Sequence, residues 1–338
     1  MSSQKLMQAA ILETHGAPLR LTKVSRPVPQ PHQVLVRIIA SGVNPLDGKI
    51  HEGAAIHARH PLPAISGLDL AGVVEAVGSE VTRFGRGDEV YGLTGGVGGV
   101  PGSLAEFAAV DEALLAIKPT NFTMREAAAM PLIFITAWEG LVDRMNVSAG
   151  QMVLVQGGAG GIGHVAIQIA RARGATVFAT GAASSRAFIE QLGATFIDYR
   201  SEEVSDYVTR HTNGKGFDLV YDTVGGPTLD ASFAAVRVFG HVVSALGWGT
   251  HSLAPLSFKA ATYSGVFTLL PLLTGEGRLH HGEIMEQATQ LAEAGQLLPR
   301  VDPRRFVLAT ATDAIEAVKA KIGNGKIVVE VADFESEA

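Results

Sequence analysis

The chain has 338 residues, 47% of them hydrophobic and 39 of them glycine, which suggests two folded domains and excludes extended disorder. Its net charge of -6 and the lack of any basic run exclude nonspecific binding to nucleic acid. The absence of cysteine excludes disulfides, thiolate metal ligands and thiol nucleophiles.

Residues 1–16 lack the apolar core of a signal peptide, so we expect a cytoplasmic protein that does not associate with membranes.

The sequence of the first part of the chain predicts a domain rich in β-strands. The glycine-rich stretch 94–102 has no strand and helix on either side, so we interpret it as a flexible loop. Short apolar runs between turn residues are typical of a barrel or sandwich, and they predict strands over Gln8–Leu12, Leu19–Val24, Val34–Ala40, Ala71–Val77, Glu89–Leu93 and Ala105–Val110.

From Met124 the pattern becomes helical, and a strand, a turn, a helix and a second strand follow within Met152–Thr180. The turn contains glycines with the spacing G-x-G-x-x-G: Gly158, Gly160 and Gly163. These glycines permit the sharp turn, the approach of backbone to a pyrophosphate and the close packing of helix on strand. The N–H groups at the helix start, including those of Gly161 and Ile162, then bind the phosphates. We infer a dinucleotide site.

The residues that follow the second strand decide which dinucleotide is bound. An NAD site places an acid about 20 residues after the first glycine, but here no acid occurs between Thr180 and Glu190. Hydroxyl groups and a guanidinium suit a 2′-phosphate, so we predict NADPH, held by Thr180, Ser184, Ser185 and Arg186. The alternative is that Arg186 is a solvent-exposed residue in the first turn of a helix.

Further alternation of strands and helices predicts a parallel, doubly wound sheet. The apolar run Gly265–Leu273 fits an edge strand, and because a bare apolar edge would aggregate, we expect a homodimer that pairs these edges. A helix at Ala311–Lys321 and a strand at Lys326–Val331 are expected to return to the first domain. The other predicted elements are the strands Thr195–Tyr199, Phe217–Thr223 and His241–Leu246 and the helices Met124–Met130, Thr136–Arg144, Thr228–Arg237 and Glu283–Ala294.

Motifs along almost the whole chain resemble the medium-chain dehydrogenase/reductase superfamily, in its zinc-independent quinone oxidoreductase (zeta-crystallin-like) branch. They are the glycine turn and the segments Gly42–Asp47, Gly67–Gly78, Val81–Phe84, Gly87–Val90, Thr136–Trp138, Tyr221–Gly226 and Gly325–Val328. The resemblance implies an α/β fold with two domains. A GroES-like, β-rich catalytic domain would comprise residues 1–123 and 297–338, and a Rossmann NADP-binding domain with a doubly wound parallel sheet would comprise residues 124–296.

The zinc enzymes of this superfamily use two cysteines and a histidine as catalytic ligands. This chain has no cysteine, and Gly67-Leu68-Asp69 stands where those enzymes have Gly-His-Glu. A tetrahedral zinc site cannot be built from these ligands, so we predict no metal. The clustered His51, His57 and His60 do not change this prediction, because nothing in the sequence supplies groups to orient them.

The resemblance also implies the site residues. Asn44, Asp47 and Thr136 are expected to act in catalysis, with Thr136 near the nicotinamide ribose, and a local turn role before Pro45 is the alternative for Asn44. Tyr199 is expected to pack on the adenosine end, with a half-buried strand position as its alternative. The remaining coenzyme contacts are expected from Val224, Leu246, Asn324 and Lys326.

Without a metal or a thiol, the chemistry that fits is direct hydride transfer to a small-molecule acceptor. We predict an NADPH-dependent reductase of quinones or α,β-unsaturated carbonyl compounds. One alternative is a protein that binds NADPH without catalysis, as crystallin relatives do. The other is an alcohol dehydrogenase, which the missing zinc ligands disfavour.

Overall fold

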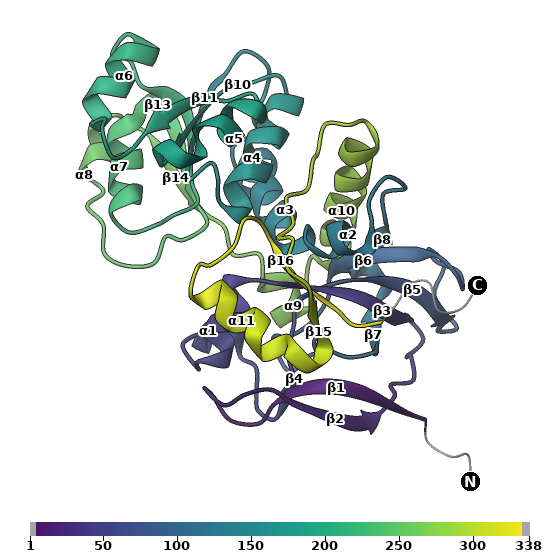
Figure 1. Ribbon diagram of the computed structural model, residues 1–338. Helices are drawn as coiled ribbons and strands as arrows, with labels where there is room; N and C mark the ends of the chain where they lie inside the picture. Colours follow the sequence, from purple (N-terminus) through teal and green to yellow (C-terminus); the bar gives the residue numbers. More distant parts are fainter. Residues whose placement is uncertain (1–4, 333–338) are drawn as a thin grey trace. The chain divides into compact units, whose positions relative to one another are not determined.

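The computed structural model describes residues 5–332, and the chain divides into two compact units (Figure 1). Unit 1 comprises residues 1–132 and 269–338, and unit 2 comprises residues 133–268. The sequence analysis places the boundaries elsewhere, because it assigns residues 124–132 and 269–296 to the coenzyme domain. The predicted α/β class is confirmed.

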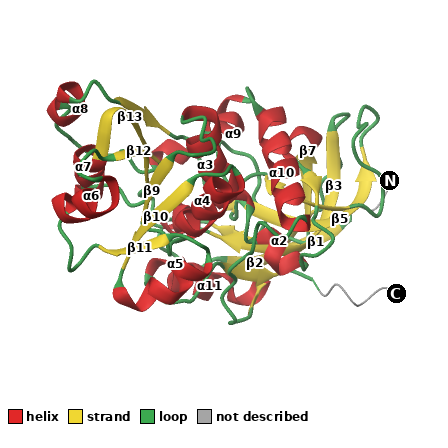
Figure 2. Ribbon diagram, turned by 90° about the horizontal axis from the view of Figure 1, so that it is seen from above, coloured by secondary structure: helices red, strands yellow, loops and turns green. Residues whose placement is uncertain are grey.

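Unit 2 is built on one parallel sheet of six strands in the order β11-β10-β9-β12-β13-β14 (Figure 2). The chain enters at the central strand β9, adds two strands on one side and then three on the other, which is the doubly wound order expected from the sequence. Ligands of such sheets bind at the carboxyl ends of the strands where the order reverses. The strands are β9 (Met152–Gln156), β10 (Thr176–Gly181), β11 (Thr195–Asp198), β12 (Phe217–Asp222), β13 (Val236–Ser244) and β14 (Thr262–Gly265).

Helices cover both faces of this sheet. Phe178 and Ala179 are neighbours in β10, so their side chains point to opposite faces. Phe178 packs in the core with Phe233 of α7, whereas Ala179 lies on the face of Ile167 in α4 and Ile189 in α5. The helices of the crossovers are α4 (Gly161–Ala172), α5 (Arg186–Gln191), α6 (Val204–Thr212), α7 (Pro227–Ala235) and α8 (Ala254–Phe258).

The prediction of an edge strand over Gly265–Leu273 is confirmed only at Gly265 and is wrong for the residues after it. The edge strand is β14, which ends at Gly265, and the apolar residues after it continue into the short helix α9 (Leu270–Thr274). Pro271 lies in the first turn of this helix, where the missing N–H of proline is tolerated, whereas a strand would lose a ladder hydrogen bond. An apolar run alone does not distinguish a strand from a buried helix.

Unit 1 is organised around its longest strand, β3 (Gln33–Val43), which pairs with β5 on one side and with β7 and β16 on the other. The C-terminal strand β16 therefore returns to this unit, as the sequence predicts (yellow in Figure 1). A separate three-stranded sheet has the order β2-β1-β4. The other strands are β1 (Leu6–Leu12), β2 (Arg20–Ser25), β4 (Ala64–Ile65), β5 (Asp69–Val77), β6 (Glu89–Leu93), β7 (Phe107–Asp111), β8 (Ala116–Ile117), β15 (Phe306–Val307) and β16 (Ile327–Glu330).

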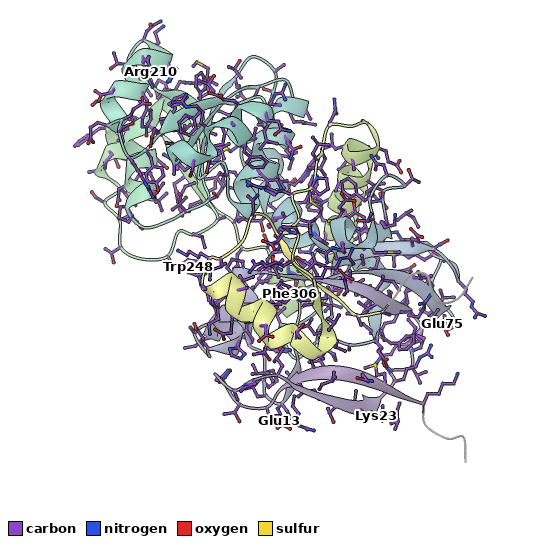
Figure 3. The ribbon with its side chains drawn as sticks, viewed as in Figure 1. Glu13, Lys23, Glu75, Arg210, Trp248 and Phe306 are labelled. Carbon is purple, nitrogen blue, oxygen red and sulfur yellow. The ribbon has the colours of Figure 1, made fainter. Side chains whose placement is uncertain are left out.

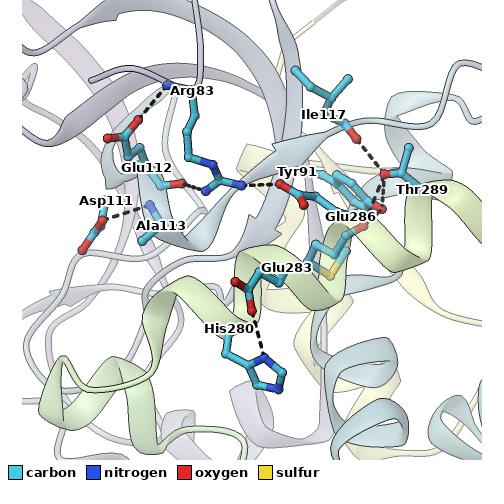
Figure 4. Close-up of polar contacts among 11 residues, drawn as sticks. Arg83, Tyr91, Asp111, Glu112, Ala113, Ile117, His280, Glu283, Glu286 and Thr289 are labelled. Carbon is cyan, nitrogen blue, oxygen red and sulfur yellow. Dashed lines mark hydrogen bonds and ion pairs between the residues drawn. The ribbon is translucent and has the colours of Figure 1, made fainter. Parts of the chain in front are cut away.

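Helix α10 (Arg278–Glu293) packs in unit 1 (Figure 4). The hydroxyl of Tyr91 in β6 donates to the carbonyl of Met285 at 2.9 Å, and Arg83 pairs with Glu286 at 2.6 Å. The amphipathic pattern of this helix shows that it has one apolar face, but not which sheet that face covers. Contacts far apart in sequence decide that assignment.

The remaining helices are α1 (Pro45–His51), α2 (Met124–Ala128), α3 (Pro131–Trp138) and α11 (Ala311–Lys319), and a π-helical segment, Glu139–Arg144, continues α3. Within residues 5–332, no helix combines the length and the apolar character needed to span a bilayer. The glycine-rich stretch 94–102 has no regular structure, but Thr94 and Val97 are buried in it. The predicted loop is therefore confirmed and is partly packed, and its flexibility stays a prediction.

Candidate functional site

The glycine turn of unit 2 connects β9 to α4, and its shape depends on the absence of side chains. A Cβ on Gly163 would lie 2.1 Å from the carbonyl oxygen of Gly157, and one on Gly158 would lie 2.6 Å from the Cβ of Ala179. Gly160 is the N-cap of α4, so the N–H groups of Gly161 and Ile162 have no partner within the helix. The turn therefore has the geometry of a phosphate cradle.

Thr180 fixes this turn from the neighbouring strand β10. Its hydroxyl accepts a hydrogen bond from the N–H of Gly157 at 3.0 Å and donates to the side-chain oxygen of Gln156 at 2.8 Å. The threonine side chain is buried. Its demonstrated role is thus to hold β9, β10 and the turn together, and a direct coenzyme contact stays a prediction.

The residues between β10 and Glu190 include no acidic side chain, and several of them are exposed. Ser184 is exposed and Ser185 is half-buried, and the side chain of Arg186 is 57% exposed. The Arg186 guanidinium lies 4.4 Å from the centre of the Phe196 ring and pairs with Glu190 at 3.3 Å. A phosphate bound here would compete with one exposed carboxylate.

Tyr199 follows β11, which lies beside β10 in the sheet. Its ring is 55% exposed, and its hydroxyl accepts a hydrogen bond from the Nε of Arg200 at 3.3 Å. Arg200, which the sequence analysis did not single out, adds a second guanidinium at this edge of the sheet. The exposed ring is available for the predicted adenosine contact.

The loops that carry Val224 and Leu246 are joined by one buried carboxylate. Asp222 accepts hydrogen bonds from the N–H groups of Val224 at 3.1 Å and Gly225 at 3.0 Å, and from the hydroxyl of Ser244 at 2.7 Å. Ser244 in turn accepts the N–H of Leu246 at 3.0 Å. The sequence analysis missed Asp222, although an acid between a buried strand and two glycines is a signal for such a turn.

Thr136 belongs to a chain of hydroxyl groups within unit 2. Its Oγ1 lies 3.1 Å from that of Thr268, which donates to the carboxylate of Glu139 at 2.7 Å. The backbone carbonyl of Thr136 accepts a hydrogen bond from the hydroxyl of Tyr221 at 2.7 Å. These contacts fix the position of Thr136, and its predicted role beside the nicotinamide ribose stays a prediction.

Unit 1 contains a buried polar cluster, which we define as Asn44, Asp47, Asp69 and Lys326. The register of the sheet brings these residues together, because Gly42 pairs with Asp69 and Val43 pairs with Ile327. Asn44 follows β3 as the N-cap of α1, Asp47 lies in the first turn of that helix, and Lys326 precedes β16.

Hydrogen bonds fix the Asn44 amide within this cluster. Its Nδ2 donates to Asp69 at 2.9 Å, and its Oδ1 accepts from the ammonium of Lys326. The backbone N–H of Asn44 donates to Asp47 at 2.7 Å. The orientation of the amide is therefore set by a carboxylate on one side and an ammonium on the other.

Burial shifts the protonation of the cluster. It raises the pKa of Asp47 to about 7, although the Asn44 N–H opposes this shift, and it raises the pKa of Asp69 to about 6, although Lys326 opposes it. Burial lowers the pKa of Lys326, and the two carboxylates oppose that change. The cluster thus holds ionisable groups whose charges are costly unless they stay paired.

Two other predictions concern residues near this cluster. Asn324 lies outside it, in an exposed turn where its side chain accepts a hydrogen bond from Arg300 and its N–H donates to Asp302 at 2.7 Å.

In the part of the chain that the structure describes, no group of three or more His, Asp or Glu side chains is arranged to hold a metal. His51 and His60 instead contact backbone carbonyl groups, at 2.8 and 3.3 Å.

Two protein families match separate parts of the chain. A family described as "Alcohol dehydrogenase GroES-like domain" matches residues 30–120, and one described as "Zinc-binding dehydrogenase" matches residues 192–329. The 2-methylene-furan-3-one reductase of Solanum lycopersicum is 36% identical over 310 residues, covering 88% of this chain and 71% of that protein. The NADPH-dependent alkenal/one oxidoreductase, chloroplastic, of Arabidopsis thaliana is 34% identical, covering 88% and 72%. The quinone oxidoreductase of Homo sapiens is 32% identical, covering 75% and 77%.

Solved structures share the fold. The crystal structure of an alcohol dehydrogenase superfamily protein from Novosphingobium aromaticivorans superposes with a TM-score of 0.95 at 60% identity, covering 96% of this chain and 100% of that one. The quinone oxidoreductase from Coxiella burnetii gives a TM-score of 0.83 at 27% identity, covering 97% and 100%.

Proposed function

Because the chain belongs to the medium-chain dehydrogenase/reductase superfamily, we propose that it is an NADPH-dependent reductase of quinones or α,β-unsaturated carbonyl compounds that works without a metal. The family and the relatives named above make it an oxidoreductase of the quinone and alkenal/one type. The observation that carries the choice of NADPH is the exposed edge after β10, where Ser184 and Arg186 replace the acid of an NAD site.

The coenzyme would be held by the carboxyl edge of the sheet in unit 2. The glycine turn can pack tightly against its surroundings because Gly158 and Gly163 have no Cβ, and the N-terminus of α4 behind it favours the negative charge of a pyrophosphate. Ser184, Ser185 and Arg186 would bind the 2′-phosphate. Tyr199 would contact the adenosine, and Val224 and Leu246 would lie along the remainder of the coenzyme.

When bound, NADPH supplies a hydride. For an enone acceptor, hydride added at the β-carbon would shift the carbon–carbon double bond to the α-carbon and carbonyl carbon, the carbonyl π pair would move to oxygen as an enolate, and the α-carbon would then take a proton from solvent. The chain contributes by positioning the reactants, excluding water and stabilising the oxyanion. We propose Asn44 as a neutral donor for that oxygen and Thr136 as a contact of the nicotinamide ribose.

The residues of this chain do not fit the zinc site of the superfamily. The chain has no cysteine, and Leu68-Asp69 stands where the zinc enzymes have His-Glu. The cation of the buried cluster is the ammonium of Lys326, which already bonds to the Asn44 side chain and to the carbonyl of Val43.

We also propose that the protein forms a homodimer through β14. This strand is one of the two outer strands of the sheet in unit 2, and the apolar side chains of Val238 and Phe239 are exposed on the neighbouring strand β13. An uncovered edge of this kind favours association. Light scattering at micromolar concentration tests the proposal, and the mass of a monomer would contradict it.

A second candidate function is NADPH binding without catalysis. The observation that favours it is the complete burial of Asn44, whose amide is already engaged by Asp69 and Lys326. A screen of NADPH oxidation against a panel of quinones and enones, with coenzyme binding measured in parallel, separates the two candidates. Turnover supports the reductase, and binding without any turnover supports the binding protein.

A further inference from the structure

Two aromatic rings lie together at the carboxyl edge of the sheet in unit 2. Trp248 follows β13 and Phe267 follows β14, and these strands pair in register up to Ser244 and Gly265. The two ring centres are 6.2 Å apart with planes at 86°, an edge-to-face arrangement. The indole is 55% exposed, whereas Phe267 is half-buried and supports it (Figure 3 labels Trp248).

Both rings lie close to residues of the proposed coenzyme site. Trp248 comes two residues after Leu246, whose N–H is held by Ser244 at 3.0 Å. Phe267 directly precedes Thr268, whose hydroxyl lies 3.1 Å from that of Thr136. Two separate loops therefore place an aromatic ring near the proposed coenzyme site.

An exposed indole at this place is suited to bind a flat, conjugated group. Aromatic rings prefer offset-stacked or edge-to-face partners, and such pairs stabilise a complex beyond the area they bury. The contact with Phe267 restricts the indole, so less side-chain freedom is lost when a ligand stacks on it. A short aliphatic acceptor offers no ring for this contact.

We infer that Trp248 and Phe267 form an aromatic wall that selects acceptors with a planar ring conjugated to the reacting double bond or carbonyl, such as quinones and aryl enones. This inference rests on the proposed reductase function and narrows its substrate class. Short aliphatic enals and enones are then poorer substrates.

Phe258 is the matched control for this wall. It is also an exposed aromatic side chain of unit 2, with 89% of its surface exposed. However, it ends α8 and precedes β14, so it lies at the amino end of that strand. Its replacement by leucine removes a ring without touching the carboxyl edge.

The first test is binding without coenzyme or turnover. The chain has two tryptophans, and Trp138 is buried, so fluorescence quenching by an added quinone reports mainly on Trp248. We expect naphthoquinone to quench the wild type and F258L saturably and to quench F267L, which keeps the reporting indole, with a weaker apparent affinity. An apparent affinity in F267L equal to that of the wild type would overturn the inference.

The second test is discrimination between two enones that differ in the ring. We expect W248L to lower the ratio of kcat/KM for benzylideneacetone over ethylideneacetone by between about twofold and about tenfold, the range of one aromatic contact. W248F should keep most of the ratio, and F258L all of it. An unchanged ratio in W248L overturns the inference, as does a loss of the dimer in W248L, which would assign the ring to the interface.

These outcomes separate the inference from the function on which it rests. If the wild type reduces neither enone nor any quinone, the proposed function fails, while the quenching experiment still decides whether Trp248 binds a planar ring. If the wild type reduces both enones and W248L keeps their ratio, the reductase function stands and the aromatic wall fails.

Discussion

Replacement of Arg186 by alanine should remove most of the preference for NADPH over NADH. The guanidinium is exposed at the end of β10, and a hydrogen bond between charged groups stabilises a complex by about 1.5–3 kcal/mol, which corresponds to about 10- to 150-fold in affinity. Arg186 must give up its contact with Glu190, whose side chain is 50% exposed. An exposed pair of this kind is worth only about 0.2–1 kcal/mol, so the net loss on R186A should lie in the lower part of that range.

Dissociation constants for NADPH and NADH, measured by quenching or calorimetry on the same preparations, test this reasoning. R186A should weaken the binding of NADPH and leave the affinity for NADH almost unchanged. E190Q should increase the affinity for NADPH by at most about fivefold, because the competing carboxylate is removed. Arg210 is the matched control, since it is a half-exposed arginine of the same unit that pairs with Glu202. An NADPH/NADH ratio in R186A equal to that of the wild type would refute the assignment.

Three further predictions concern unit 1. Asn44→Ala should lower turnover by about 100-fold, the cost of one lost oxyanion donor, while the dissociation constant for NADPH stays unchanged; a variant that loses only coenzyme affinity would contradict this role. Chelation should leave activity intact, and elemental analysis that finds one zinc per chain would contradict the metal-free proposal. Because burial raises the pKa of Asp47 from 3.8 to about 7, the native wild type holds this proton more tightly than the unfolded chain and loses stability as the pH rises through that window. The free energy of unfolding of D47N, relative to wild type in urea titrations, should therefore increase between about pH 4 and about pH 8, and a constant difference would contradict this.

The elements that the sequence predicts best are those whose pattern is local. The segment from Met152 to Gly181 contains a buried strand, a glycine turn and an amphipathic helix in immediate succession, and the structure has all three. The assignment of α10 to unit 1 depends on contacts such as the one between Tyr91 and Met285, which are 194 residues apart. Local periodicity contains no information on such a choice.

Helix α1 illustrates a signal that was present but not used. Asn44 followed by Pro45 is a helix start, with an N-cap residue and a proline in the first turn. The sequence analysis gave Asn44 a catalytic role, or a turn role before Pro45 as the alternative, and did not predict the helix. The same helix start places Asp47 against the backbone N–H of Asn44.

The buried cluster could be predicted only in part. Asn44, Asp47 and Lys326 were expected to belong to the site, but Asn44 and Lys326 are 282 residues apart and meet through the pairing of β3 with β16. Asp69 was noted only as a departure from the zinc enzymes, and its bond to the Asn44 amide follows from the register of β3 and β5. Register depends on the whole sheet and is not readable from one strand.

The most direct test of the central claim follows the hydride. Benzylideneacetone is reduced with NADPH that carries deuterium at the transferable position of the nicotinamide, and the product is examined by NMR. The proposed function predicts deuterium at the β-carbon of a saturated ketone, with a solvent proton at the α-carbon. Deuterium at the former carbonyl carbon of an alcohol product would show an alcohol dehydrogenase and contradict the account.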